Sequence, residues 1–309
     1  MTVSAILGPV QTAFELGLIC ALTVLALYLS YSMLNVCDLS TDGCFTMGAA
    51  VGAAVALAGH PYLSIPAAMA AGVCSGLITA VLQTKLGVNS LLAGIIVNTG
   101  LYSVNIAIMG GSSLLNLNKT ETVFTKVKAL LENTPLAGQY KLLVALVFVA
   151  IVVLFLSFFL RTRLGLSIRC TGDNPDMVRS SSINPARMTI IGLCISGAIT
   201  ALSGCLLAQA QKSMDINIGT GMVTIALASL LIGGTILGKG GVTVRAIGVV
   251  LGSIIFRLVY TIALRFNMPA FMLKAVSSVI VVLAISLPYL KSQKDTLLRR
   301  FGKGGQTKC

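Results

Sequence analysis

Long apolar runs separated by short polar segments occupy most of this chain and restrict the folds open to it. A run of about 20 apolar residues can cross a bilayer as a helix. The runs are too long and continuous for the alternating strands of a membrane barrel. Charged residues make up only 10% of the chain, against about 25% in soluble domains. We therefore predict an all-α polytopic membrane protein with about nine transmembrane helices, at 11–34, 43–59, 63–83, 88–109, 141–160, 187–210, 221–237, 243–265 and 269–290.

The basic residues predict how these helices are oriented. Lys and Arg concentrate in 161–187, at Lys239 and Arg245, and in the tail 291–309. Because basic loops stay on the cytoplasmic side, nine alternating spans put the N-terminus outside and the C-terminus in the cytoplasm. We expect one transmembrane domain over 1–290 and a basic cytoplasmic tail. The net charge of +13 forms no patch interleaved with aromatic residues, so membrane lipid, and not nucleic acid, is the expected partner.

Two segments share a pattern that suggests an internal repeat. Gly17 to Leu57 and Gly192 to Leu231 each hold a span with small residues, a polar turn with an aspartate, and a short helix rich in small residues. The two spans are predicted to run in opposite directions, which would make the halves an inverted repeat of the kind found in transporters. The polar segment Asn35 to Gly43 is either an ordinary turn or a re-entrant segment buried by protein.

Polar side chains inside predicted spans are candidates for function. Asn98 and Asn105 are seven residues apart and therefore share one face of a helix, where they either line a polar path or bond a neighbouring helix. With Asp38 and Ser40 they form the candidate substrate path.

Charged side chains near the predicted outer ends of spans suggest an ion pair. Glu15 is expected to pair with Arg257 or with Lys274. The alternative is that these bases extend to the membrane interface.

The chain offers no convincing catalytic or metal-binding arrangement. Segment 233–239 fits the start of a phosphate-binding loop, but Gly240 stands where a Ser or Thr should hold Mg²⁺, and an apolar helix precedes it instead of a strand. One histidine, His60, and eight cysteines without paired spacing leave no metal cluster. We expect no enzyme activity and no cofactor in this chain.

A polar island, 161–187, interrupts the apolar runs and carries five arginines against two aspartates. Within it, Asn174 can cap a helix and Pro175 suits the first helical position. Apolar Met177, Val178 and Ile183 are expected to be exposed there. A membrane protein keeps such a loop where another protein docks, so the island predicts a docking site.

Three motifs occur in order along the chain and carry a family resemblance. The motifs are Asp38-x-Ser40-x-Asp42-Gly43, Gly172-x-Asn174-Pro175 and the segment Ala228 to Gly241. Together with the span pattern they resemble the permease subunits of ABC importers of the branched-chain amino acid and ribose-type group, closest to a branch of uncharacterised or aromatic-amino-acid-type permeases. The resemblance covers about 10–290.

The resemblance implies a partnership and a mechanism. Such permeases work as a pair, here a homodimer, in the cell membrane of bacteria. Two cytoplasmic ATPases bind ATP and Mg, and an extracellular or periplasmic binding protein delivers the solute, which moves by alternating access. A coupling helix docks on each ATPase. By position its residues here are Asn174, Pro175, Met177, Val178, Arg179, Ser182 and Ile183.

The sequence leaves open the end of the coupling helix, the exact substrate and two competing functions. Ser182 stands where the family often has glycine, which leaves the end of the coupling helix undecided. The resemblance implies an amino acid or a related small compound as substrate. The competing functions are an ion-coupled secondary transporter, for which acids near the spans are few, and a membrane scaffold, which does not explain the island.

Overall fold

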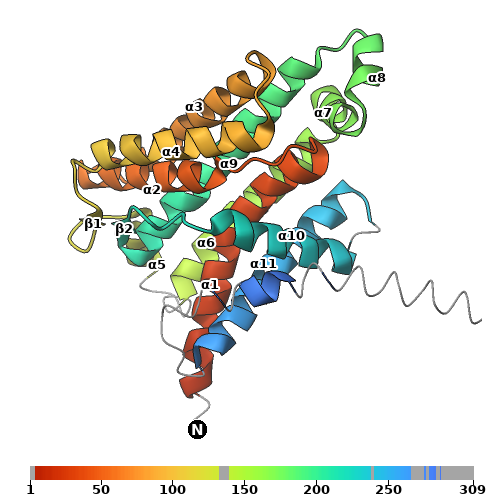
Figure 1. Ribbon diagram of the computed structural model, residues 1–309. Coiled ribbons are helices and arrows are strands. Elements are labelled where there is room, and N and C mark those ends of the chain that lie inside the picture. The colour runs from red at the N-terminus through yellow and green to blue at the C-terminus, as the bar shows by residue number, and fades with distance from the viewer. Residues whose placement is uncertain are drawn as a thin grey trace, which may run out of the picture.

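The computed structural model describes residues 4–131, 139–237 and 240–265, with 275, 278–282 and 286 beyond them. About 79% is helical, and the one sheet of the described residues is a two-stranded ribbon (Figure 1). The elements follow in this order: α1 Ser4–Leu27, η1 Tyr28–Met33, α2 Thr41–Leu57, α3 Ser64–Thr84, α4 Ser90–Ile108, β1 Leu114–Asn116, α5 Val123–Leu131, α6 Tyr140–Phe159, α7 Arg163–Asp173, α8 Pro175–Ser180, α9 Pro185–Gln211, β2 Ser213–Asp215, α10 Met222–Leu237 and α11 Val242–Arg265.

Six helices in the described part are long and apolar enough to cross a membrane, which confirms the polytopic helical class. They correspond to α1 with η1, α3, α4, α6, α9 and α11. Two further apolar helices, α2 and α10, have only 17 and 16 residues. The ninth predicted run, 269–290, lies largely outside the described residues, as do Lys239 and the basic tail. The number of nine spans and the orientation therefore stay predictions.

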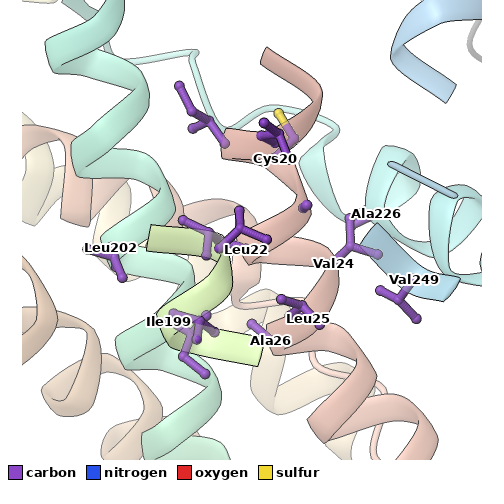
Figure 2. Packing of buried hydrophobic residues seen from close by; sticks show 14 of the residues in the cluster. Cys20, Leu22, Val24, Leu25, Ala26, Ile199, Leu202, Ala226 and Val249 are labelled. Atoms are coloured by element: carbon purple, nitrogen blue, oxygen red, sulfur yellow. The ribbon is translucent and has the colours of Figure 1, made fainter. Parts of the chain in front are cut away.

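Helices α1 and α9 form the centre of the bundle. In each of these two helices 78% of the most apolar stretch is buried, against 28–33% in the other four membrane-length helices. Figure 2 shows Leu22 and Leu25 of α1 on the same side of α9 as Ile199, in one hydrophobic cluster. The side chains of Ser196 and Ser203 on α9 donate hydrogen bonds to the carbonyl oxygens of Ala26 and Ile19 at 3.0 and 2.7 Å. The residue numbers increase along α9 while those of the contacted residues on α1 decrease, so the two helices are antiparallel.

The same order of elements occurs twice around these two helices. Each half has a long helix (α1 or α9), an irregular segment, a short helix (α2 or α10) and a third helix (α3 or α11). The third helix of each half packs along the long helix of the other, α3 on α9 and α11 on α1. Because α1 and α9 are antiparallel, the two halves run in opposite directions, as an inverted repeat requires.

The short helix α2 begins halfway along α9. The Cys44 thiol, in the first turn of α2, donates to the carbonyl oxygen of Gly197, near the middle of α9 (3.3 Å). One turn further on, Gly48 faces the backbone of Ala201, where no side chain has room. The turn before α2 therefore enters the bundle, and Asp38 in it is only 4% exposed. This burial favours the re-entrant alternative for the segment 35–43.

Candidate functional site

A polar pocket of about 410 Å³ lies where the two short helices begin. One wall is the first turn of α2, the second is α4, and the third is the loop between β2 and α10. A cavity of this size takes small solutes. Its lining residues are Asp42, Gly43, Thr46, Asn98, Thr99, Tyr102, Ser103, Asn105, Ile216, Asn217, Gly219 and Thr220.

Asn98 and Asn105 both line this pocket, as expected for residues on one face of α4. The Asn105 amide nitrogen also donates to the carbonyl oxygen of Gly43 on α2 at 3.3 Å. Its carboxamide oxygen is buried without a hydrogen-bond partner. Asn105 therefore bonds a neighbouring helix and also lines the pocket, while the polar path through it stays a prediction.

Asp38 and Ser40 lie beside the pocket without lining it. The Asp38 carboxylate accepts hydrogen bonds from the backbone N–H and the hydroxyl of Ser40 at 2.9 and 2.6 Å. The Thr79 hydroxyl on α3 donates to the Ser40 hydroxyl at 3.1 Å. These bonds satisfy the polar groups of the buried turn. In this structure Asp38 and Ser40 stabilise the turn before α2 and so fix the position of the first turn of α2, which lines the pocket.

Asp42 is the site residue that sequence reasoning did not select. Its carboxylate accepts the backbone N–H of Gly221 at 2.9 Å and of Val223 at 2.8 Å, at the start of α10. It is thus a helix cap supplied by another helix, which satisfies two donors that a helix start leaves free. Its place in the first turn of an apolar run was visible in the sequence, but its partner 179 residues away was not.

The predicted ion pair of Glu15 with Arg257 is not formed in the structure. The Arg257 guanidinium donates to the Cys20 sulfur at 3.1 Å and lies over the Tyr260 ring, while Glu15 accepts from Gln11. The ion pairs found in the described residues are Glu121–Lys126 and Asp176–Arg179. The other proposed partner, Lys274, lies outside the described residues.

The polar island folds into two short helices at the end of the bundle opposite the ribbon (Figure 1). The Asn174 side chain accepts the N–H groups of Asp176 and Met177, both at 3.1 Å, and Pro175 is the first residue of α8. The prediction that Asn174 caps a helix beginning at Pro175 is confirmed, while its role in coupling stays a prediction. Helix α8 ends at Ser180, so Ser182 and Ile183 of the predicted coupling segment follow it.

The end of α8 shows why glycine suits position 182. Ser182 has a φ of +62°, in the left-handed region. The N–H of Ser182 bonds the carbonyl of Arg179, and the N–H of Ile183 bonds that of Val178. This pair of bonds is the Schellman ending of a helix, whose left-handed residue is most often glycine.

Exposure of the apolar island residues differs from the expectation. Met177 is 66% exposed, but Val178 is only 3% exposed and Ile183 is half-buried. Because α8 packs on α7 and α9, one face of so short a helix is covered. The prediction that Val178 is an exposed docking contact is therefore wrong, and Met177 is the apolar side chain that α8 presents outward.

Replacing Ser182 by glycine is expected to stabilise the end of α8 by about 0.5–1 kcal/mol. A non-glycine residue in the left-handed region costs roughly 1–2 kcal/mol, and the greater freedom of glycine in the unfolded chain offsets part of that gain. Amide hydrogen exchange of 175–183 measures the effect. Ser181→Gly is the matched control, because Ser181 has a φ of −87° and should gain nothing. Equal protection in both variants would contradict the assignment.

The island contacts the rest of the bundle through a close backbone approach. A side chain on Gly172, near the end of α7, would meet the carbonyl oxygen of Met33 and the backbone of Leu34. These two residues end the first long helix and lead into the buried turn before α2. The island therefore bears directly on the segment that carries the pocket wall.

Two antiparallel halves of apolar helices, each with a short helix that begins at a polar pocket open to the surface at Tyr102, form the arrangement of a membrane transport protein. Residues 11–285 match the family described as the branched-chain amino acid transport system permease component. The chain belongs to this family. It is accordingly a membrane-embedded permease of the ABC transporter type for small solutes, a transport component and not an enzyme. Membership implies ATPase and binding-protein partners in general.

Individual relatives agree with the family. A tyrosine transport system permease protein of Clostridioides difficile (strain R20291) is 33% identical over 267 residues, 86% of each chain. The ribose import permease protein of Escherichia coli (strain K12) is 26% identical over 258 residues, 80% of this chain and 75% of its own. A guanosine ABC transporter permease protein of Bacillus subtilis (strain 168) is 29% identical over 185 residues, 57% of each chain. No solved structure matches the chain. The resemblance read from the motifs is confirmed.

Proposed function

We propose that this chain is the permease subunit of an ATP-driven importer that moves an amino acid or a related small compound. Two copies form the transmembrane pathway in the inner or cytoplasmic membrane of a bacterium, with the N-terminus outside and 161–187 in the cytoplasm. Two partner ATPases bind ATP and Mg, and an external binding protein delivers the solute. The observation that carries the proposal is α8, a separately capped helix that presents Met177 outward from the arginine-rich island.

The pocket supports a small polar solute. Its lining is mostly amides and hydroxyls, and these groups bond neutral or zwitterionic compounds in either direction. The tyrosine permease relative is more similar to this chain than the ribose permease is, and it covers more of it. We therefore prefer an amino acid, with L-tyrosine as the first compound to test.

The lining also argues against the runner-up, an ion-coupled secondary transporter. Such a protein needs an acid that takes up and releases a cation or proton within the membrane. Asp42 is the acid among the lining residues, and two backbone N–H groups already occupy its carboxylate. An energy source outside the chain fits this lining better.

Co-purification with the ATPase subunit tests the proposed docking site. Replacing Asn174–Ser182 by a Gly/Ser linker of equal length should abolish association, because the capped helix is lost. Met177→Glu should weaken association at least ~10-fold, since an exposed apolar anchor carries much of a contact of this kind. Leu166→Glu on α7 is the matched control and should have little effect, as Leu166 is also exposed but lies outside α8. Full association of the linker variant would refute the placement.

A further inference from the structure

We propose that Asp42 is a positioning residue for transport: its carboxylate joins the start of α10 to the start of α2, so that the pocket wall moves as one piece. The inference rests on the proposed function. It adds to that function a residue whose loss uncouples ATP hydrolysis from solute transport. Asp42 is assigned no contact with the solute.

Two short hydrogen bonds to Asp42 join the start of α2 to the start of α10. Its two carboxylate oxygens each take one backbone N–H of the α10 start, at 2.9 and 2.8 Å, from residues 179 and 181 positions away in sequence. The loop before α10 also touches α2 directly, since a side chain on Gly219 would meet the Asp42 carbonyl oxygen and the Thr46 hydroxyl. The first turns of the two short helices therefore form one unit at the pocket.

The charge of Asp42 explains why this residue type suits the position. Asp42 is half-buried, and an acid partly withdrawn from water is costly unless hydrogen bonds and an opposite charge compensate it. The start of α10 supplies both, because its N–H groups are free and the helix dipole is positive there. The two N–H groups go to different oxygens of the carboxylate, and an amide would place an NH₂ donor where one of these oxygens stands. The carboxylate is therefore suited to binding the N-terminus of α10, and we assign it no role in binding the solute.

The far half of α10 is linked to the start of the polar island through α11. Gly233 in α10 packs against the backbone of Gly248 in α11. Near the start of α11, the Thr243 hydroxyl bonds the Ser157 hydroxyl and accepts from the Arg161 guanidinium, the latter at 3.1 Å. Arg161 begins the island that carries α8. Helix α10 therefore runs from the pocket to α11, whose start bonds Arg161 at the beginning of the island, and Asp42 is the contact at the pocket end of α10.

The test uses the permease reconstituted in lipid vesicles with its ATPase and binding protein. Four forms are compared: wild type, Asp42→Asn, Asp42→Glu and Asp215→Asn. Asp215 is the matched control, because its carboxylate accepts the nearby N–H of Asn217 at 2.8 Å and, within the described ranges, bonds no second helix. ATP hydrolysis and L-tyrosine uptake are measured in each form, and the melting temperature reports folding.

We expect Asp42→Asn to lower uptake at least ~10-fold while hydrolysis stays within ~2-fold of wild type, so that more ATP is used per solute moved. Asp42→Glu, which keeps both acceptors, should recover part of the uptake, and Asp215→Asn should match wild type. Equal losses of uptake and hydrolysis, or an Asp42→Asn variant that matches Asp215→Asn, would overturn the proposal. A merely structural role would lower both activities and the melting temperature together.

A second measurement does not depend on the solute. Failure of wild type to bind the ATPase would refute the proposed function, and failure to take up L-tyrosine would refute only the substrate. In the latter case, hydrogen exchange of 219–224 is compared with and without ATP and vanadate. Exchange that accelerates in Asp42→Asn only in the trapped complex supports the proposal. Exchange that is the same as in Asp215→Asn in both states overturns it.

Discussion

Replacing Gly48 by alanine is expected to lower the free energy of unfolding by about 3 kcal/mol, although it adds only one methyl group. The new Cβ atom would clash with the carbonyl oxygen and the Cα atom of Ala201. Both clashing atoms belong to helix backbone, so no rotamer change relieves the clash. Helices α2 and α9 would have to separate, and membrane helices lose their packing contacts when small residues at an interface are enlarged.

Gly100→Ala provides the control for this prediction. Gly100 is also in a membrane helix, α4, and a side chain there would meet no atom within 4 Å. Alanine should leave stability unchanged or raise it by up to about 1 kcal/mol, because it favours helix over glycine. Thermal unfolding of both variants in the same detergent measures the difference. A Gly48→Ala protein as stable as the Gly100→Ala protein would show that α2 and α9 are less tightly packed than described.

Replacing Gly172 by alanine is expected to lower ATP-driven uptake at least ~10-fold without releasing the ATPase. The methyl group would push α7 away from the backbone of Met33 and Leu34. The docking helix α8 is capped by its own residues and should keep its shape. The ATPase would still bind to α8. The movement of the ATPase would be transmitted poorly to the bundle, because the contact of α7 with Met33 and Leu34 would be displaced.

The readouts for Gly172→Ala are co-purification, ATP hydrolysis and uptake, taken on the same preparation. Gly234→Ala is the control, since Gly234 lies on α10 with no atom within 4 Å of an added side chain. Loss of ATPase binding in Gly172→Ala would mean that α7 is itself part of the docking surface. Normal uptake would mean that the contact with Met33 and Leu34 transmits nothing.

Local rules predicted the parts of the site that depend on nearby residues. The cap by Asn174 and the first helical position of Pro175 require only a few consecutive residues, and both are found as expected. Asn98 and Asn105 share a face because of helical spacing, and both reach the pocket. The apolar runs predicted the membrane-length helices, since length and composition decide whether a helix can cross a bilayer.

Contacts between distant residues were beyond such rules. The burial of Val178 depends on how α8 rests on α7 and α9, and the partner of Arg257 proved to be Cys20 and not Glu15. Ser182 marked the end of the docking helix as a departure from the family pattern, but only the backbone angle shows that the position is left-handed.

By itself, the sequence determined that this protein is a bundle of membrane helices, that its polar island starts a helix at Asn174, and which family it belongs to. Those properties follow from composition, from spacing along one helix and from motifs in order. The tertiary structure decided where the pocket lies and that Asp42 closes its wall. The reason is physical: a carboxylate bonds whichever N–H groups the fold brings near, and here these belong to a helix that begins 180 residues later.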